Sequence, residues 1–368
     1  MKILYFWKEH SGVMAQWQRV HFFDELEKHG CYINVFNPIN YPTTNEANEK
    51  LINYIRNNKY DLFITPYGNK ELYLETLKLI KSSGLPTLLI CFDNLSQPFI
   101  HKNICKHYDL VWLTSRDTEH MFLKWGAKTL FIPYAANPFY FSIKSSLETR
   151  ELVFIGTPHG NRANIINSLT DNKINVHLFA NIKKSNPSYQ KPPLVNYIVP
   201  MINYMRFDIG RRIIAGAIKQ RIEKTGRLNV NSSFLHIKGE GSTSFMEMNK
   251  IYSDYALSLS STTWRNTDTL RNPVNVVDLK CYEIPMCGGL LFSRYSDELA
   301  SYFEEDKEII YYRTNEEMIE KAIFYLKPEN DNLRITLKKN ARKKAENEHT
   351  WFIRFKKVFD YLGLSYQR

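Results

Sequence analysis

The chain has 368 residues, of which 43% are hydrophobic, 24% charged and 14% aromatic. This length favours two domains over one compact core, and the composition excludes disordered, collagen-like and low-complexity classes. No apolar run approaches the roughly 20 residues of a membrane-spanning helix, and the first residues lack the pattern of a secretory signal. The five cysteines form no C-x-x-C pair, which disfavours a disulfide scaffold or a zinc ribbon. We therefore expect a cytoplasmic protein.

The formal net charge of +11 is concentrated in one segment. Residues 181–230 contain ten basic and two acidic side chains, which amounts to +8 and leaves +3 for the rest of the chain. The excess is a local feature rather than a property of the whole surface.

Apolar strand patterns alternate with helical patterns through the first third of the chain. Strands are predicted at residues 2–7, 31–36, 62–65, 87–92, 110–114 and 129–132. Helices are predicted between them, at residues 16–28, 46–57, 71–82 and 117–124. This alternation is typical of a parallel, doubly wound sheet.

The alternation starts again after residue 150. Strands are predicted at residues 151–156, 175–179, 234–238, 255–259 and 289–292, and helices at 162–169, 243–252, 274–286, 316–326 and 333–348. We expect an α/β protein of two Rossmann-like domains facing a cleft, at 1–145 and 146–350, with a basic insertion at about 185–233. Residues 351–368 are expected to form a helix that crosses back to the first domain.

Two loops at predicted strand ends have the composition of an anion site. In parallel sheets, ligands bind at the carboxyl ends of strands, where backbone N–H groups are free. Gly156 opens a loop that reaches Arg162 at the start of a helix, and Lys238 ends another strand. Neither loop matches a dinucleotide or P-loop motif, so an ordinary strand–helix loop stays open as the alternative.

A third segment is more specific. A helix carrying Glu283 runs into a glycine pair and then an apolar strand, in the order Lys280-Cys281-Tyr282-Glu283-Ile284-Pro285-Met286-Cys287-Gly288-Gly289-Leu290-Leu291-Phe292. This segment resembles the signature of the spore maturation protein CgeB-like glycosyltransferases, which have the GT-B fold. The resemblance extends to Val153-Phe154-Ile155-Gly156, Glu308-Ile309-Ile310-Tyr311-Tyr312, Asn340-Ala341-Arg342 and Glu348-His349-Thr350-Trp351. The family usually has Arg at the position of Lys280, and Asn275 stands where many retaining enzymes carry a first Glu.

The resemblance implies a transferase that moves a sugar from a nucleoside-diphosphate sugar to a hydroxyl group. The second domain would bind the donor and the first domain the acceptor, without a metal or other cofactor. Glu283 would hold the ribose hydroxyls, because a carboxylate accepts two hydrogen bonds from a vicinal diol. The other expected donor contacts are Arg162, Lys238, Lys280, Gly156, Gly288, Gly289, Thr263 and Arg271. A helix end remains the alternative for the glycine pair.

The implied acceptor is a glycan, a lipid-linked molecule or a protein in bacterial surface glycan assembly (lipopolysaccharide, capsule or glycoprotein). His10 and Asp93 follow predicted strands of the first domain and are alternative candidates for the catalytic base. A non-catalytic binding protein or membrane scaffold on the same fold is the competing hypothesis.

The basic insertion mixes apolar and cationic residues at 197–227, with Pro200 and Gly210 expected to interrupt its helices. This pattern is typical of an interfacial helix that contacts the inner face of the plasma membrane. A helix packed within its own domain or in a homodimer is the alternative, and no nucleic-acid motif accompanies the charge.

Overall fold

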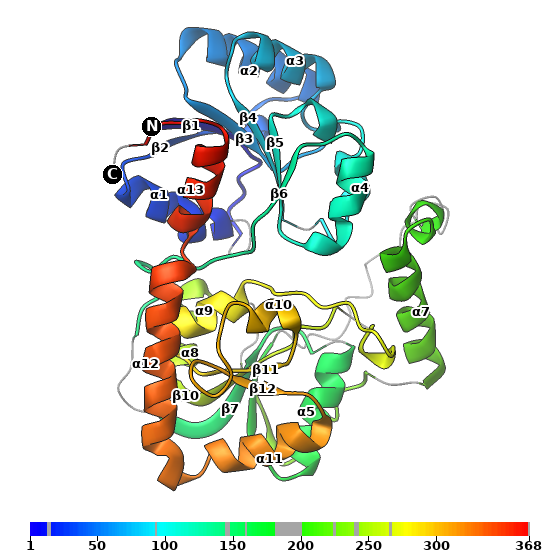
Figure 1. Ribbon diagram of the computed structural model, residues 1–368, viewed down its shortest axis with the longest axis vertical. Helices are drawn as coiled ribbons and strands as arrows, with labels where there is room; N and C mark the ends of the chain where they lie inside the picture. Colours follow the sequence, from blue (N-terminus) through cyan, green and yellow to red (C-terminus); the bar gives the residue numbers. More distant parts are fainter. Residues whose placement is uncertain are drawn as a thin grey trace. The chain divides into compact units, whose positions relative to one another are not determined.

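The computed structural model (Figure 1) describes residues 1–12, 16–92, 94–143, 148–158, 160–180, 201–223, 226–238, 243–264 and 267–366. The chain divides into two compact units. Unit 1 comprises Met1–Tyr140 and His349–Arg368, and unit 2 comprises Phe141–Glu348. The C-terminal helix is therefore part of the same unit as the first strand.

Unit 1 contains a six-stranded sheet in which every strand pairing is parallel. In spatial order the strands are β2 (Tyr32–Phe36), β1 (Lys2–Phe6), β3 (Leu62–Thr65), β4 (Thr87–Cys91), β5 (Leu110–Leu113) and β6 (Thr129–Phe131). The helices are α1 (Asp24–Lys28), α2 (Thr44–Asn57), α3 (Leu74–Ser82), α4 (Glu119–Lys124) and α13 (Trp351–Tyr361), with a π-helical turn η2 (Arg19–Phe23) before α1. Short 3-10 turns lie at η3 (Pro38–Asn40), η4 (Pro98–His101), η5 (Cys105–His107) and η6 (Arg116–Thr118).

Alternate residues of β1 face opposite sides of this sheet, as the two-residue repeat of a strand requires. Leu4 belongs to a buried cluster with Leu51 of α2 and Leu77 of α3. Tyr5 contacts the rings of Phe22 and Phe23 on the other face. Figure 1 shows the corresponding layers, with α2 and α3 on one side of the sheet and α1 and α13 on the other.

Unit 2 contains a second six-stranded sheet that is also parallel throughout. Its strands, in spatial order, are β12 (Ile310–Tyr312), β11 (Leu291–Arg294), β10 (Tyr255–Ser260), β7 (Thr149–Ile155), β8 (Val176–Phe179) and β9 (Leu235–Lys238). Its helices are α5 (Asn161–Asp171), α7 (Asp208–Glu223), α8 (Phe245–Asp254), α9 (Lys280–Met286), α10 (Asp297–Ala300), α11 (Asn315–Tyr325) and α12 (Asp331–Glu348), with 3-10 turns η7 (Thr267–Thr269) and η8 (Pro328–Asn330). The predicted doubly wound α/β organisation is thus confirmed in both units.

Two local predictions were wrong, and one strand was missed. The helix expected at 274–286 begins only at Lys280, because Trp264 donates to the Val274 carbonyl and Val276 to the Thr262 carbonyl, which holds 274–276 extended. The three-residue strand β12 was not predicted. Gly210 does not interrupt a helix but lies buried in the first turn of α7, where an added Cβ would collide with the Tyr204 carbonyl.

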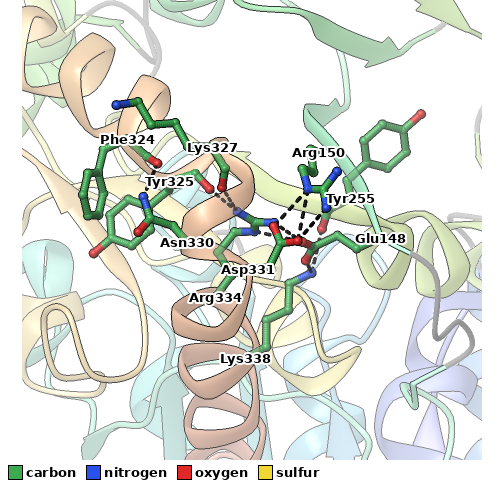
Figure 2. Close-up of polar contacts among 10 residues, drawn as sticks. All are labelled: Glu148, Arg150, Tyr255, Phe324, Tyr325, Lys327, Asn330, Asp331, Arg334 and Lys338. Carbon is green, nitrogen blue, oxygen red and sulfur yellow. Dashed lines mark hydrogen bonds and ion pairs between the residues drawn. The ribbon is translucent and has the colours of Figure 1, made fainter.

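The long helix α12 is tied to the amino-terminal ends of β7 and β10 by an ion-pair cluster (Figure 2). The guanidinium of Arg334 is fully buried and donates to Glu148 (2.8 Å) and Asp331. Arg150 also pairs with Asp331, and Lys338 pairs with Glu148 and donates to the Tyr255 carbonyl oxygen at 2.9 Å. Hydrogen bonds and charge from Arg150 and Arg334 lower the pKa of Asp331 to about 2. Each buried cation therefore has a carboxylate partner, as burial of a charge requires.

The C-terminal helix α13 is fixed to unit 1 by a buried carboxylate. Glu25 accepts hydrogen bonds from the backbone N–H groups of Trp351 (3.0 Å) and Phe352 (2.8 Å), which are unsatisfied within the helix. The Trp351 indole donates to His21 at 3.1 Å, and Arg354 donates to the Pro133 carbonyl at 3.2 Å. Burial raises the pKa of Glu25 to about 7, although these N–H donors oppose the shift.

The raised pKa of Glu25 predicts a pH dependence of stability. The folded protein keeps this proton up to about pH 7, whereas the unfolded chain loses it near the ordinary value of 4.5. Stability therefore decreases as the pH rises between these values, because the folded state then binds more protons than the unfolded state. We expect Glu25→Gln to show a smaller fall in melting temperature from about pH 5 to about pH 8. Glu27→Gln, on the exposed side of the same helix, should keep the wild-type fall; an equal fall in all three proteins would contradict this prediction.

Candidate functional site

The sheet of unit 2 has a topological switch point between β7 and β10. Counted along the chain, its strands lie in the order 3-2-1-4-5-6, so the connections leave β7 and β10 in opposite directions. The crevice beyond the carboxyl ends of two such strands is where ligands bind in open α/β sheets. Gly156 follows β7 at this edge, Ser261 follows β10, and α9 begins beside them.

Lys280, the first residue of α9, occupies this crevice. Its ammonium group donates a 2.7 Å hydrogen bond to the Ile155 carbonyl oxygen at the end of β7. It also lies 5.2 Å from the centroid of the Phe154 ring. Gly156 has φ +129°, and a Cβ built on it would lie 2.8 Å from the Lys280 ammonium. A glycine is therefore needed here both for its backbone conformation and for the room it leaves to the lysine.

Neighbouring groups shift the pKa of Lys280 in opposite directions. Burial lowers its pKa, Asp278 and Glu283 counteract this by their negative charge, and Arg162 adds to the lowering. Asp278 also accepts a hydrogen bond from the Lys280 backbone N–H at 3.2 Å, at the start of α9. The result is a cation that is held at the end of β7 by its hydrogen bond to Ile155.

Arg162 brings a second cation to the same place. It lies in the first turn of α5, and its guanidinium carbon is 5.9 Å from the centroid of the Phe154 ring that Lys280 also approaches. The residue before this helix is Gly160 (φ +62°), which has no side chain to accept from the first helical N–H groups. Two cations and a helix N-terminus thus converge at the switch point, an arrangement suited to phosphate groups.

Glu283 lies one turn along α9 from Lys280 and is only 2% exposed. Its charge acts on both Lys280 and Tyr252. The structure therefore places the predicted carboxylate near the predicted cation, on the same helix.

The strand β10 leads into a buried hydroxyl-rich segment at this edge. Thr262 donates to the Arg294 carbonyl oxygen at 3.0 Å, whereas the Thr263 hydroxyl, in a residue 5% exposed, has no hydrogen-bond partner in the described part of the chain. Thr263 therefore stays a candidate donor contact. Arg271, the other candidate from this region, lies exposed in the following loop. Burial raises the pKa of Asp268 nearby, with Arg294 opposing the shift.

Phe154, Asp278 and Asp268 were not among the site residues that the sequence predicted. The position of Phe154, two residues before a glycine at a strand end, was a usable signal. Asp278 follows the pattern of a helix-start residue, but it was hidden because the helix was expected to begin earlier.

Gly288 and Gly289 lie away from this site, contrary to the donor contacts that the resemblance implies. They end α9 and precede β11, so they lie at the amino-terminal edge of the sheet, opposite the switch point. Gly288 has φ +73° and borders a pocket of about 730 Å³ together with Lys338 and Arg342 of α12. A Cβ at Gly289 would lie 2.7 Å from the Tyr252 carbonyl oxygen. Both glycines thus serve the helix end and its packing, which was the alternative interpretation.

Lys238 is exposed at the end of β9, two strands away from β7. Neighbouring strands are about 4.8 Å apart, so its backbone lies roughly 10 Å from the end of β7. No contact in the described structure brings Lys238 to Lys280 or Arg162. Its role as a donor contact stays a prediction.

The two candidate bases belong to unit 1. His10 is exposed in the loop that follows β1, at the carboxyl edge of that sheet. Asp93 lies outside the described residues. Both stay predictions.

Comparison with known proteins agrees with this architecture. Residues 211–360 match a protein-family model described as glycosyl transferase-like, which spans α9 and the segment around Glu283. No curated protein sequence matches the chain significantly. The CgeB-like family itself is not singled out by these findings.

Several solved structures have the same fold. HepE (Alr3699) from Anabaena has a TM-score of 0.55 at 14% identity, with 99% of each chain covered. Sucrose-phosphate synthase from Thermosynechococcus elongatus has a TM-score of 0.54 at 13% identity, and a glycosyltransferase from Rickettsia africae has 0.55 at 11%, both with 99% of each chain covered. The chain therefore has the GT-B fold, which confirms the predicted fold class.

The contact between Gly156 and Lys280 generates a stability prediction. Gly156→Ala should destabilise unit 2 by about 1–2 kcal/mol through its left-handed backbone, plus a further penalty from the collision with Lys280. Gly84→Ala is the matched control, because its φ of +80° brings similar strain but no atom lies within 4 Å of the new Cβ. In a double-mutant cycle measured by urea unfolding, Lys280→Ala should reduce the penalty of Gly156→Ala. An unchanged penalty in the Lys280→Ala background would show that the two residues do not interact.

Proposed function

We propose that the protein is a glycosyltransferase that moves a sugar from a nucleoside-diphosphate sugar to a hydroxyl acceptor. The observation that carries this proposal is the convergence of Lys280, Arg162 and the N-terminus of α5 at the switch point of unit 2. A diphosphate is the ligand whose charge and size fit two cations and a row of backbone N–H groups.

In this proposal the crevice supports departure of the nucleoside diphosphate. When the bond between the sugar and the diphosphate breaks, negative charge develops on the terminal phosphate oxygen. Lys280 and Arg162 stabilise that charge, and Lys280 needs little reorganisation during the reaction because its hydrogen bond to Ile155 already holds it in place. These side chains supply the positive charge, so the proposal calls for no metal ion. Glu283 would accept hydrogen bonds from the ribose hydroxyls.

The known proteins support the donor class. Structures of the Anabaena protein HepE are described as complexes with UDP and glucose and with UDP-glucose. The family-model match over 211–360 includes Lys280 and Glu283. Transfer of this donor class to the present chain is part of the proposal.

The acceptor side of the proposal rests on the resemblance to the CgeB-like family. It assigns the enzyme to surface glycan assembly, with a glycan, lipid-linked or protein hydroxyl as acceptor. His10 is the described candidate for the base that would deprotonate this hydroxyl, because it follows β1 at the carboxyl edge of its sheet. A binding protein or scaffold without transferase activity is the second candidate function.

Thermal shift with UDP, GDP, CDP, dTDP and CMP tests the donor site. A ligand at 100 times its dissociation constant stabilises the folded state by about 2.7 kcal/mol, so one or more of these nucleotides should raise the melting temperature of the wild type. Glu283→Ala should remove most of this increase. Glu320→Ala, an exposed glutamate on another helix of unit 2, should retain it.

Glu283→Gln is the control for misfolding, because it keeps the size of this buried side chain while removing its charge. Stabilisation that is equal in the wild type and both Glu283 variants would contradict the proposed ribose contact. Release of nucleoside diphosphate from the matching nucleotide sugar then separates an enzyme from a scaffold, which would bind the nucleotide without turning the sugar over.

A further inference from the structure

The helix α7 is held to unit 2 by one face. Arg212 donates to the carbonyl oxygens of Asn272 (2.7 Å) and Pro273 (2.8 Å), and Lys219 donates to that of Thr269. On this inner face Ile209 and Gly216 are buried. Figure 1 shows α7 at the margin of unit 2, outside the layers that cover the sheet.

The segment after α7 is anchored separately. The Gly226 N–H donates to the Asn164 side chain at 2.8 Å, and the Asn229 N–H donates to Asn167 at 2.9 Å, both along α5. The helix and the segment that follows it are therefore attached to unit 2 at several points.

The outer face of α7 carries large apolar side chains. The 3.6-residue repeat places Arg211, Ala215, Ile218 and Ile222 on the side opposite Ile209. Ile218 is 56% exposed and Ile222 is 74% exposed. The preceding helical residues 201–205 expose three more apolar side chains, Met201 (44%), Ile202 (51%) and Met205 (45%). Such a concentration of exposed apolar residues marks a surface that binds something.

Cations frame this apolar surface. Residues 201–223 include five basic and two acidic side chains. Arg206 and Arg221 are exposed and form no ion pair within the described part of the chain, and on the helix Arg221 flanks the line of Ile218 and Ile222. Helices that lie in a membrane interface combine apolar side chains on one line with flanking lysines and arginines in this manner.

We propose that the outer faces of 201–205 and α7 bind the surface of an anionic lipid bilayer. The isoleucines and methionines would enter the boundary between headgroups and acyl chains, while Arg206, Arg211 and Arg221 contact lipid phosphates. This is peripheral binding: within the described ranges, no helix has the length and apolar character needed to cross a bilayer.

Charge complementarity favours lipid over a second copy of the chain as the occupant. Residues 201–223 carry five basic and two acidic side chains, so two copies of this positively charged segment would repel each other, whereas an anionic lipid surface attracts it. The flanking cations thus oppose self-association through this face and favour a lipid surface.

The contacts that attach α7 to unit 2 also connect the proposed lipid-binding face to the carboxyl edge of the sheet, where the switch point lies. The loop that receives Arg212 and Lys219 follows β10 at the carboxyl edge of the sheet, and Gly226 lies close to Gly160 at the start of α5. Membrane binding would thus hold the carboxyl edge of unit 2 close to the lipid. The proposal does not depend on transferase activity, and its test needs no donor or acceptor.

Co-flotation with vesicles tests the proposal on the full chain. Vesicles of phosphatidylcholine mixed with phosphatidylglycerol should bind the wild type, whereas vesicles of phosphatidylcholine alone should bind far less. Arg206→Gln/Arg221→Gln should lower the partition coefficient roughly 20-fold or more, since each cation near an anionic surface contributes about fivefold. Ile218→Ser/Ile222→Ser should lower it on the order of tenfold.

The controls are exposed residues elsewhere in unit 2. Met246→Ser/Ile323→Ser removes two apolar side chains that are 69% and 47% exposed, and Lys250→Gln/Lys343→Gln removes two exposed cations. Both control proteins should float like the wild type. Absence of flotation, equal binding to neutral vesicles, or an equal loss in the controls would overturn the proposal.

Light scattering on the same proteins tests whether a second copy of the chain, rather than lipid, covers this face. A wild-type dimer that Ile218→Ser/Ile222→Ser converts to a monomer would show that another copy covers this face, and it would overturn the membrane proposal. A mass that is the same in the wild type and this variant, together with selective flotation, supports it. Neither result bears on nucleotide binding, so failure here is distinguishable from failure of the proposed transferase function.

Discussion

The ammonium group of Lys280 donates to the carbonyl oxygen of Ile155, and this hydrogen bond holds together the part of unit 2 in which we place the chemistry. It joins the start of α9 to the end of β7 across 125 residues of sequence. A buried cation needs acceptors and negative charge, which Ile155, Asp278 and Glu283 provide. The ammonium also limits the space at Gly156, the residue after Ile155, because a Cβ built there would lie 2.8 Å from it.

Parallel pairing is what brings these residues together. All strands of the sheet point the same way, so every strand-to-helix loop opens at one edge, and the reversal between β7 and β10 leaves a crevice between two of those loops. The amino-terminal edge of the sheet has a structural role, because there the ion pairs of Arg334 and Lys338 connect α12 to the amino-terminal ends of the strands. In unit 1 a buried carboxylate has an equivalent structural task, since Glu25 caps α13 from a distant helix.

The sequence predicted most strands and helices because their apolar residues repeat at the spacing of buried strands and amphipathic helices. The strand-end rule predicted a site at Arg162, and the family resemblance added Lys280 and Glu283, which the structure places on the helix that begins beside the end of β7. It misled at Gly288 and Gly289, where closeness to Glu283 in sequence suggested closeness to the ligand, although a helix places its two ends at opposite edges of the sheet. Hydrogen bonds from Trp264 and Val276 shorten α9, and such non-local pairing leaves no periodic signal. The helical repeat separates Ile218 and Ile222 from Ile209, but only the structure showed that the face with Ile209 is the buried one.

Hydrogen–deuterium exchange with mass spectrometry is the most direct test of the claim that the switch point of unit 2 binds a nucleoside diphosphate. The protein would be compared with and without the diphosphate that raises its melting temperature. The account predicts slower exchange in peptides that cover Phe154–Arg162 and Asp278–Glu283, with the peptides of α12 unchanged. Protection confined to unit 1, or to the pocket between Gly288 and α12, would contradict it.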